Sequence, residues 1–122
     1  SFSWENKINS NLRSSLVDNY LFSISLEGFL FVTDVNSGNV IKITDIFNNF
    51  KLKNRSKIKP TGFILGSNKI YVSTNNGKLL IVDTITGKTT SILKIDNEKI
   101  SQPFIVDKDL FVIKDNAIIR LN

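Results

Sequence analysis

Residues 21–34 read LFSISLEGFLFVTD, and residues 70–83 read IYVSTNNGKLLIVD. The two stretches align without a gap, and each has two short runs of aliphatic, aromatic and β-branched residues around a turn with glycine. Such runs, bounded by Gly, Asn or Asp, predict β-strands. The pairs Glu27-Gly28 and Asn76-Gly77 predict a hairpin in each stretch, because glycine accepts the positive φ that a tight reversal needs.

The similarity extends beyond the two hairpins. Ser37-Gly38 aligns with Thr86-Gly87, and a third copy spans residues 103–121 with one residue deleted at its turn. The turn residues of successive copies, Gly28, Gly77 and Asn116, are 49 and then 39 positions apart. The unit is therefore about forty residues, with an insertion of about ten residues after the first copy. A repeat of this length made only of strands is typical of a β-propeller blade.

We therefore expect an all-β chain of tandem four-stranded antiparallel β-propeller blades, in an incomplete arc of about three blades, since a closed ring has about 4–8. The expected strands span residues 14–17, 20–25, 29–34 and 39–44, then 62–65, 69–74, 78–83 and 88–94, then 103–106, 109–114 and 117–121. No window has the periodicity of a long helix. Residues 44–50 are the one candidate for a short helical turn.

These patterns divide the 122 residues into consecutive parts of one partial propeller. The parts are the end of a preceding blade with a linker (1–13), a blade (14–44), a basic insertion (45–61), a second blade (62–97) and a last, incomplete blade (98–122).

Two kinds of turn recur and predict structural roles for six residues. In the first kind glycine reverses a hairpin, and in the second an Asp carboxylate accepts backbone N–H groups while a later glycine takes the left-handed conformation. We assign these structural turn roles to Gly28, Asp34, Gly38, Gly77, Asp83 and Gly87. A turn accounts for both aspartates, so we do not assign them to catalysis.

The composition excludes several classes of chemistry. The chain has no Cys and no His, so disulfides, thiolate metal sites, a Cys nucleophile and the commonest general base are absent. No apolar run reaches the length of a membrane helix, and residues 1–5 show no sign of a signal peptide. A net charge of +5 favours anionic surroundings without choosing among them.

The insertion carries the strongest charge pattern in the sequence. In an extended chain, alternation would place five cations on one face, namely Lys51, Lys53, Arg55, Lys57 and Lys59. They form either an electrostatic contact with an acidic partner or anionic lipid, or a solvated connection whose lysines protect a strand edge from mispairing. Both interpretations predict exposed side chains.

Nucleic-acid binding is not expected. It calls for exposed aromatic residues among the cations, and packing of the insertion onto a blade explains Phe47 and Phe50 equally well. No metal site is expected either, because Asp107-Lys108-Asp109 and Asp96-Asn97-Glu98 lack the ligand number and turn glycine of a calcium loop. Tyr71 shares its repeat position with Phe22 and Phe111, so we expect all three to pack in the core.

The pattern Asp-x-x-Ser/Thr-Gly-Lys/Asn, after an aliphatic strand and a Glu/Asn-Gly turn, resembles the PQQ-like β-propeller repeat. The resemblance covers about 110 of the 122 residues, from Ser14 to the end. The family usually has a Trp eight residues after the Asp, where this chain has Lys42 and Ser91. Trp4 fits that position in a repeat that would begin before Ser1.

The resemblance implies one of two functions. The chain is more similar to the non-catalytic members, which include the BamB-like lipoproteins of outer-membrane β-barrel assembly, because it has few repeats and lacks the paired cysteines of the quinoprotein dehydrogenases. It implies a protein-interaction scaffold without a cofactor, on the periplasmic side of the bacterial outer membrane. Its partner would be the β-barrel assembly complex, and a lipid anchor outside this chain would attach it to the membrane. The alternative is a fragment of a PQQ-dependent dehydrogenase.

Overall fold

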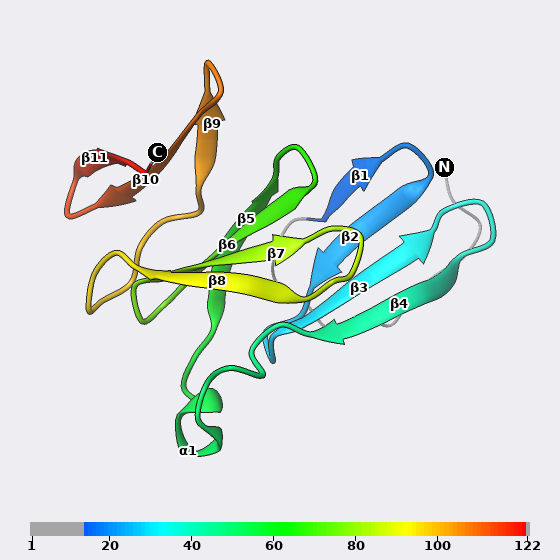
Figure 1. Ribbon diagram of the computed structural model, residues 1–122, viewed down its shortest axis with the longest axis horizontal. Coiled ribbons are helices and arrows are strands. Elements are labelled where there is room, and N and C mark those ends of the chain that lie inside the picture. The colour runs from blue at the N-terminus through cyan, green and yellow to red at the C-terminus, as the bar shows by residue number, and fades with distance from the viewer. Residues whose placement is uncertain (1–13, 122) are drawn as a thin grey trace.

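The computed structural model describes residues 14–121, so the predictions for residues 1–13, Trp4 and Asn122 lie outside the described residues. Within 14–121, three antiparallel sheets follow one another in chain order (Figure 1). The first contains β1 (Ser15–Val17), β2 (Tyr20–Ile24), β3 (Phe29–Asp34) and β4 (Asn39–Asp45); the second contains β5 (Pro60–Leu65), β6 (Lys69–Thr74), β7 (Lys78–Asp83) and β8 (Thr89–Lys94); the third contains β9 (Phe104–Val106), β10 (Asp109–Lys114) and β11 (Ala117–Arg120). Every predicted strand is confirmed, with bounds that differ by at most two residues.

Each sheet is a meander in which neighbours in sequence are neighbours in space. The first two sheets also share a register shift at the same repeat position, between Val32 and Thr33 and between Ile81 and Val82. The repeat therefore preserves the course of the backbone as well as the residue pattern. The sheets do not close into a ring within residues 14–121 (Figure 1).

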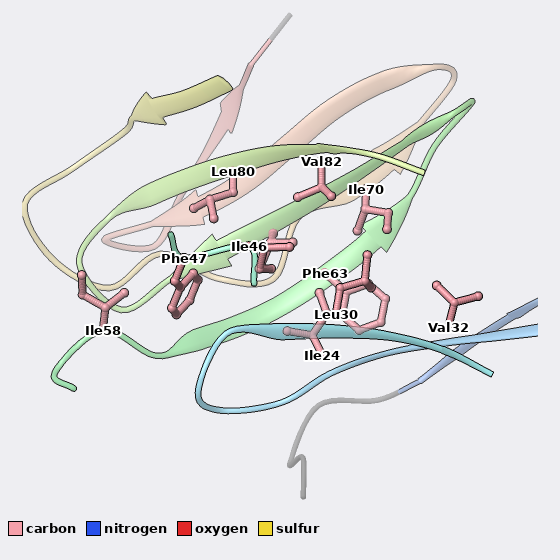
Figure 2. Close-up of a cluster of buried hydrophobic side chains, with 11 residues drawn as sticks. Ile24, Leu30, Val32, Ile46, Phe47, Ile58, Phe63, Ile70, Leu80 and Val82 are labelled. Carbon is pink, nitrogen blue, oxygen red and sulfur yellow. The ribbon is translucent and has the colours of Figure 1, made fainter. Parts of the chain in front are cut away.

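Neighbouring sheets pack through unlike faces: one face of the repeat in the first sheet contacts the opposite face of the repeat in the second. Ile24, Leu30 and Val32 of the first sheet lie on the face that carries Phe22. They form a buried cluster with the opposite face of the second sheet, which supplies Phe63, Ile70, Val72, Leu80 and Val82 (Figure 2). The third sheet continues this order, because Leu110 and Val112 occupy the repeat positions of Ile70 and Val72 and are also buried. Phe22, Tyr71 and Phe111 are each partly buried. Phe22 packs against the cluster of the first two sheets, whereas Phe111 stacks on Phe104 of its own sheet, with ring centroids 5.5 Å apart.

Hydrogen bonds across the sheet boundaries fix the sheets beside one another. Between the first two sheets, the Thr89 hydroxyl donates to the Ile46 carbonyl at 2.8 Å. Two hydrogen bonds join the second sheet to the segment just before β9. Thr61 Oγ1 donates to the Ile100 carbonyl at 3.0 Å, and Gln102 Nε2 donates to the Phe63 carbonyl at 3.0 Å. Polar groups between the sheets are therefore satisfied at the boundary itself.

The insertion corrects two predictions. A single four-residue helix, α1 (Leu52–Arg55), lies within it, so the segment is not extended and its cations do not alternate on one face. The helical turn expected over residues 44–50 is shorter than predicted: β4 continues to Asp45, and one bond from Phe50 N to the Phe47 carbonyl closes a turn. Phe47 is fully buried between the sheets, where its burial stabilises the start of the insertion (Figure 2).

Two of the turn glycines also allow a close approach of the chain. Gly28 and Gly77 have φ of 91° and 75°, and their carbonyls accept hydrogen bonds from Ile46 N and from Ile95 N respectively, just after the fourth strand of each sheet. A Cβ at Gly28 would overlap the Phe47 ring, and one at Gly77 would overlap the backbone of Asp96. Glycine is thus required by the positive φ and by the neighbouring chain.

The aspartate turns have the geometry that the motif predicts. Asp34 Oδ1 accepts a hydrogen bond from Asn36 N at 2.9 Å, and Asp83 Oδ1 accepts from Ile85 N at 2.7 Å and Thr86 N at 3.1 Å. The backbone N–H of Thr86, followed by that of Ile85, lowers the pKa of the Asp83 carboxyl below its ordinary value. The later glycines of the two turns, Gly38 and Gly87, have φ of 76° and 74°.

We expect Gly77→Ala to destabilise the chain more than Gly87→Ala, although φ is nearly equal at the two positions. Both variants lose about 1 kcal/mol or more from the positive φ. A methyl group at position 87 meets the Thr44 side chain, which can move, whereas at position 77 it meets the Asp96 backbone. Gly77→Ala should therefore lose a further ~1–2 kcal/mol in urea unfolding. An equal loss in both variants would show that the close approach at Gly77 costs nothing.

We expect the Asp83 carboxylate to make stability depend on pH in the acid range. Its pKa is lowered on folding, so its contribution is fully present above the unfolded pKa of about 4 and disappears as the pH falls through the folded pKa. Asp83→Asn should flatten the dependence of the unfolding midpoint on pH below about 4. Glu27→Gln is the control, because the Glu27 carboxylate makes no hydrogen bond or ion pair with the described residues. A slope that stays unchanged in Asp83→Asn would contradict this role.

Candidate functional site

The insertion places a group of free cations where β4 leads into β5. Figure 1 shows α1 beyond the ends of these two strands. Lys51, Lys53, Lys57 and Lys59 are all exposed. Within residues 14–121 none of the four forms a salt bridge with an acidic side chain. Their charge is therefore available to an external anion.

Arg55, the fifth predicted cation, has a different role. Its Nη2 lies 2.5 Å from Asp45 Oδ1, and its side chain is 21% exposed. Asp45 Oδ1 also accepts a hydrogen bond from Phe47 N at 3.1 Å. The Arg55–Asp45 pair therefore connects α1 to the last residue of β4, and Arg55 belongs to the fold. The sequence could not show this, because the pairing depends on the helix that turns Arg55 back towards β4.

Asn75 holds the other end of the insertion. Its Oδ1 accepts a hydrogen bond from Lys59 N at 2.9 Å, and its Nδ2 donates to the Lys57 carbonyl at 3.0 Å. The backbone N–H of Asn75 also donates to the Lys59 carbonyl at 2.9 Å. Between these bonds Ile58 is buried in the core cluster. The two lysines are thus carried on a backbone that is fixed to the second sheet.

A shallow depression lies among these residues. Its volume is about 520 Å³, and Lys51, Lys57 and Lys78 line it together with the amides of Asn49, Asn54, Asn75 and Asn76 and the side chains of Phe50 and Ile58. We call the exposed lysines Lys51, Lys53, Lys57 and Lys59, together with Lys78, the basic rim. Ammonium and amide groups donate hydrogen bonds to carboxylate or phosphate oxygens, and no carboxylate from the described part of the chain lines the depression.

Sequence reasoning missed two members of this site. Lys78 lies in the second blade, after the Asn76-Gly77 turn, and Asn75 was interpreted only as part of that hairpin. The repeat could have pointed to Asn75, because Leu26 has its position in the first copy and cannot form these hydrogen bonds. A polar residue such as Asn75, at a position where another copy of the repeat has an apolar residue, is a candidate for hydrogen bonds to a neighbouring insertion.

Within 14–121 no group of three or more Asp and Glu side chains could hold a metal ion. No helix in this part of the chain is both long and apolar enough to cross a bilayer.

Comparison with known proteins finds similarity in structure alone. No family model matches the chain, and no curated protein matches it. Among solved structures, it is similar to the quinohemoprotein alcohol dehydrogenase ADHIIG of Pseudomonas putida HK5, with a TM-score of 0.67 and 16% identity over 91% of this chain and 17% of that one. The WD40 β-propeller domain of Doa1 gives a TM-score of 0.67 and 16% identity over 88% of this chain and 34% of that one. The β-propeller domain of Myceliophteria thermophila Cps50 (Swd1) gives a TM-score of 0.63 and 16% identity over 77% of this chain and 31% of that one.

These structures share the propeller fold but differ in their titled functions, an alcohol dehydrogenase in one case and a WD40 domain in another. The chain spans about a third or less of the length of each of them. At this level of identity the likeness concerns the fold alone. Residues 14–121 therefore have the fold of an incomplete β-propeller, which confirms the predicted fold class.

Proposed function

We propose that this chain belongs to a non-catalytic scaffold that binds an acidic protein partner through the basic rim. The observation that carries the proposal is a depression lined by Lys51, Lys57 and Lys78 and by no carboxylate of residues 14–121. Lys53 and Lys59 are exposed in the same insertion, and none of these lysines forms a salt bridge with a described residue. Unpaired lysines attract an anionic surface over several ångströms and fix its orientation on contact. Propeller domains such as the WD40 domains among the structural neighbours commonly bind proteins.

The aromatic residues beside the basic rim favour protein over nucleic acid as the partner. Phe47 is fully buried, and Phe50 packs against it edge to face, with ring centroids 5.3 Å apart. Single-stranded nucleic acid is bound by exposed aromatic faces on which bases stack. Phe47 is instead buried in the core cluster, and Phe50 is partly buried against it and lines the depression with the rest of its side chain. The basic rim therefore offers mainly charge and hydrogen-bond donors, which suit a carboxylate-bearing surface.

We further propose a place for this scaffold in the cell. The turn motif that ends in Ser37-Gly38 and Thr86-Gly87 resembles that of the outer-membrane assembly lipoproteins. The partner would then be the outer-membrane β-barrel assembly complex, met on the periplasmic side, with a lipid anchor outside this chain. The alternative is a fragment of a quinone-dependent dehydrogenase, which the similarity to ADHIIG keeps open. Surface plasmon resonance with the purified assembly complex, and titration with pyrroloquinoline quinone and Ca²⁺, test the two directly.

Removing charge from the basic rim should weaken binding of an acidic probe. We expect Lys51→Gln/Lys57→Gln, which replaces two exposed lysines that line the depression, to bind a poly-glutamate peptide, and the purified assembly complex, about five- to tenfold less tightly at low salt. The dependence of affinity on salt should also become flatter, because fewer screened contacts remain. Arg55 is left unchanged, since its pair with Asp45 belongs to the fold.

The matched control removes the same charge elsewhere. Lys88→Gln/Lys99→Gln replaces two exposed lysines that do not line the depression. Equal weakening in both double variants would mean that net charge alone drives binding, which would contradict a defined site. Binding of the peptide but not of the assembly complex would keep the acidic-partner proposal and reject the cellular placement.

The position of the lysines should matter as well as their charge. Asn75→Ala keeps every cation but removes the two side-chain hydrogen bonds to Lys57 and Lys59. We expect faster hydrogen exchange at the Lys59 amide, a loss of about 1 kcal/mol in stability, and about threefold weaker binding with an unchanged salt dependence. Asn97→Ala, at an exposed position outside the depression, is the control. Full affinity in a variant with a mobile Lys59 amide would refute the positioning role.

A further inference from the structure

A second hollow lies between the second and third sheets, away from the basic rim. Its volume is about 620 Å³, within the range of about 300–1,000 Å³ usual for small-molecule sites. Lys69, the first residue of β6, lines it, whereas Asn75, just after the last residue of β6, lines the depression of the basic rim. The two hollows are therefore at opposite ends of the same strand.

The lining of this interblade cavity is mainly apolar. Tyr71, Ile81 and Leu93 contribute to it from the second sheet, and Ile105, Leu110 and Leu121 from the third sheet and the residue that follows it. These are the unlike faces that pack together elsewhere, but here they leave space between them. An apolar chain that entered the cavity would remove these side chains from water.

Gly66 helps to keep this space open. It lines the cavity at the end of β5, and a Cβ there would lie 3.0 Å from Cε2 of Tyr71 and 3.8 Å from Cδ1 of Ile105. Any side chain at this position would therefore extend towards the residues that form the cavity wall. The first copy of the repeat has Val17 at the equivalent position, so glycine is not imposed by the repeat itself.

Two cations accompany the apolar wall. Lys69 and Lys108 both line the cavity and are exposed, and no Asp or Glu among residues 14–121 lines it. Asp83 lies opposite Lys69 in the sheet. The backbone N–H groups of Thr86 and Ile85 lower the pKa of its carboxyl most, the charge of Lys69 lowers it further, and no salt bridge joins the two side chains. The cavity thus combines a wall for an apolar chain with cations that suit one anionic end.

We propose that the interblade cavity binds a small amphipathic carboxylate, with its apolar chain among Tyr71, Ile81 and Leu110 and its carboxylate against Lys69 and Lys108. The apolar surface provides affinity, and the lysines select an anion over a cation or a neutral molecule of the same length. This site is separate from the basic rim, so it is independent of the proposed protein partner.

The test uses decanoate and decyltrimethylammonium, which have the same alkyl chain and opposite charge. Isothermal titration calorimetry below the micelle concentration should show decanoate binding at least tenfold more tightly. In Lys69→Gln/Lys108→Gln, decanoate affinity should fall about tenfold and the preference for the anion should disappear. In Lys88→Gln/Lys99→Gln, whose lysines do not line the cavity, decanoate should bind as in the unchanged chain.

A second variant tests the apolar wall. Leu93, which lines the cavity and is 39% exposed, can be replaced by Trp without filling the core between the sheets. Leu93→Trp should occupy the cavity and abolish decanoate binding while the urea unfolding curve is retained. Decanoate should also shift the methyl resonances of Ile81 and Leu110 in the unchanged chain. Equal binding of the two surfactants, or decanoate binding that survives in Leu93→Trp and in the lysine variant, would overturn the proposal. Binding of a peptide with an apolar C-terminal residue, without decanoate binding, would also overturn it.

Discussion

The packing of unlike sheet faces is the constraint on which the rest of this structure depends. The face with Phe22 in the first sheet meets the face with Ile70 in the second, and the Tyr71 face of the second lies across the interblade cavity from Ile105 and Leu110 of the third. A contact between unlike faces can be repeated from sheet to sheet, whereas a contact between like faces would end with one pair. Each copy of the forty-residue repeat must therefore carry two apolar faces, one for the sheet before it and one for the sheet after it.

This packing also decides where function can lie. Most strand faces are used in the core, so the charged groups of both sites lie in turns and connections or at the first residue of a strand. The basic rim gathers Lys51 to Lys59 and Lys78 at one end of β6, and the interblade cavity opens among Gly66, Lys69 and Lys108 at the other. The basic rim combines the insertion with the second blade, and the interblade cavity combines the second blade with the third, so neither site exists within a single repeat.

The sequence predicted the strands well because their pattern is local and occurs three times, as the alignment of Leu21 with Ile70 and of Gly28 with Gly77 illustrates. The insertion occurs once, and there the prediction was wrong in detail. Alternation of cations implied an extended chain, but α1 turns Arg55 onto Asp45, a contact between residues ten positions apart that the helix creates. Asn75 was missed because its partners, Lys57 and Lys59, are reached only through the fold. The positive φ of Gly77 could be predicted, whereas the overlap with Asp96 could not.

The insertion is held at both ends, and this is what makes a basic surface from a basic sequence. At its start, the Gly28 carbonyl accepts Ile46 N, and the buried Phe47 ring fills the space that a side chain at Gly28 would need. At its end, Asn75 binds the backbone on both sides of the buried Ile58. A free ten-residue loop with the same charges would lose conformational entropy on binding, at a cost of about 0.5–1.5 kcal/mol for each long side chain alone. Here folding has already ordered the backbone that carries the lysines, so more of their attraction for an anionic partner remains as binding free energy.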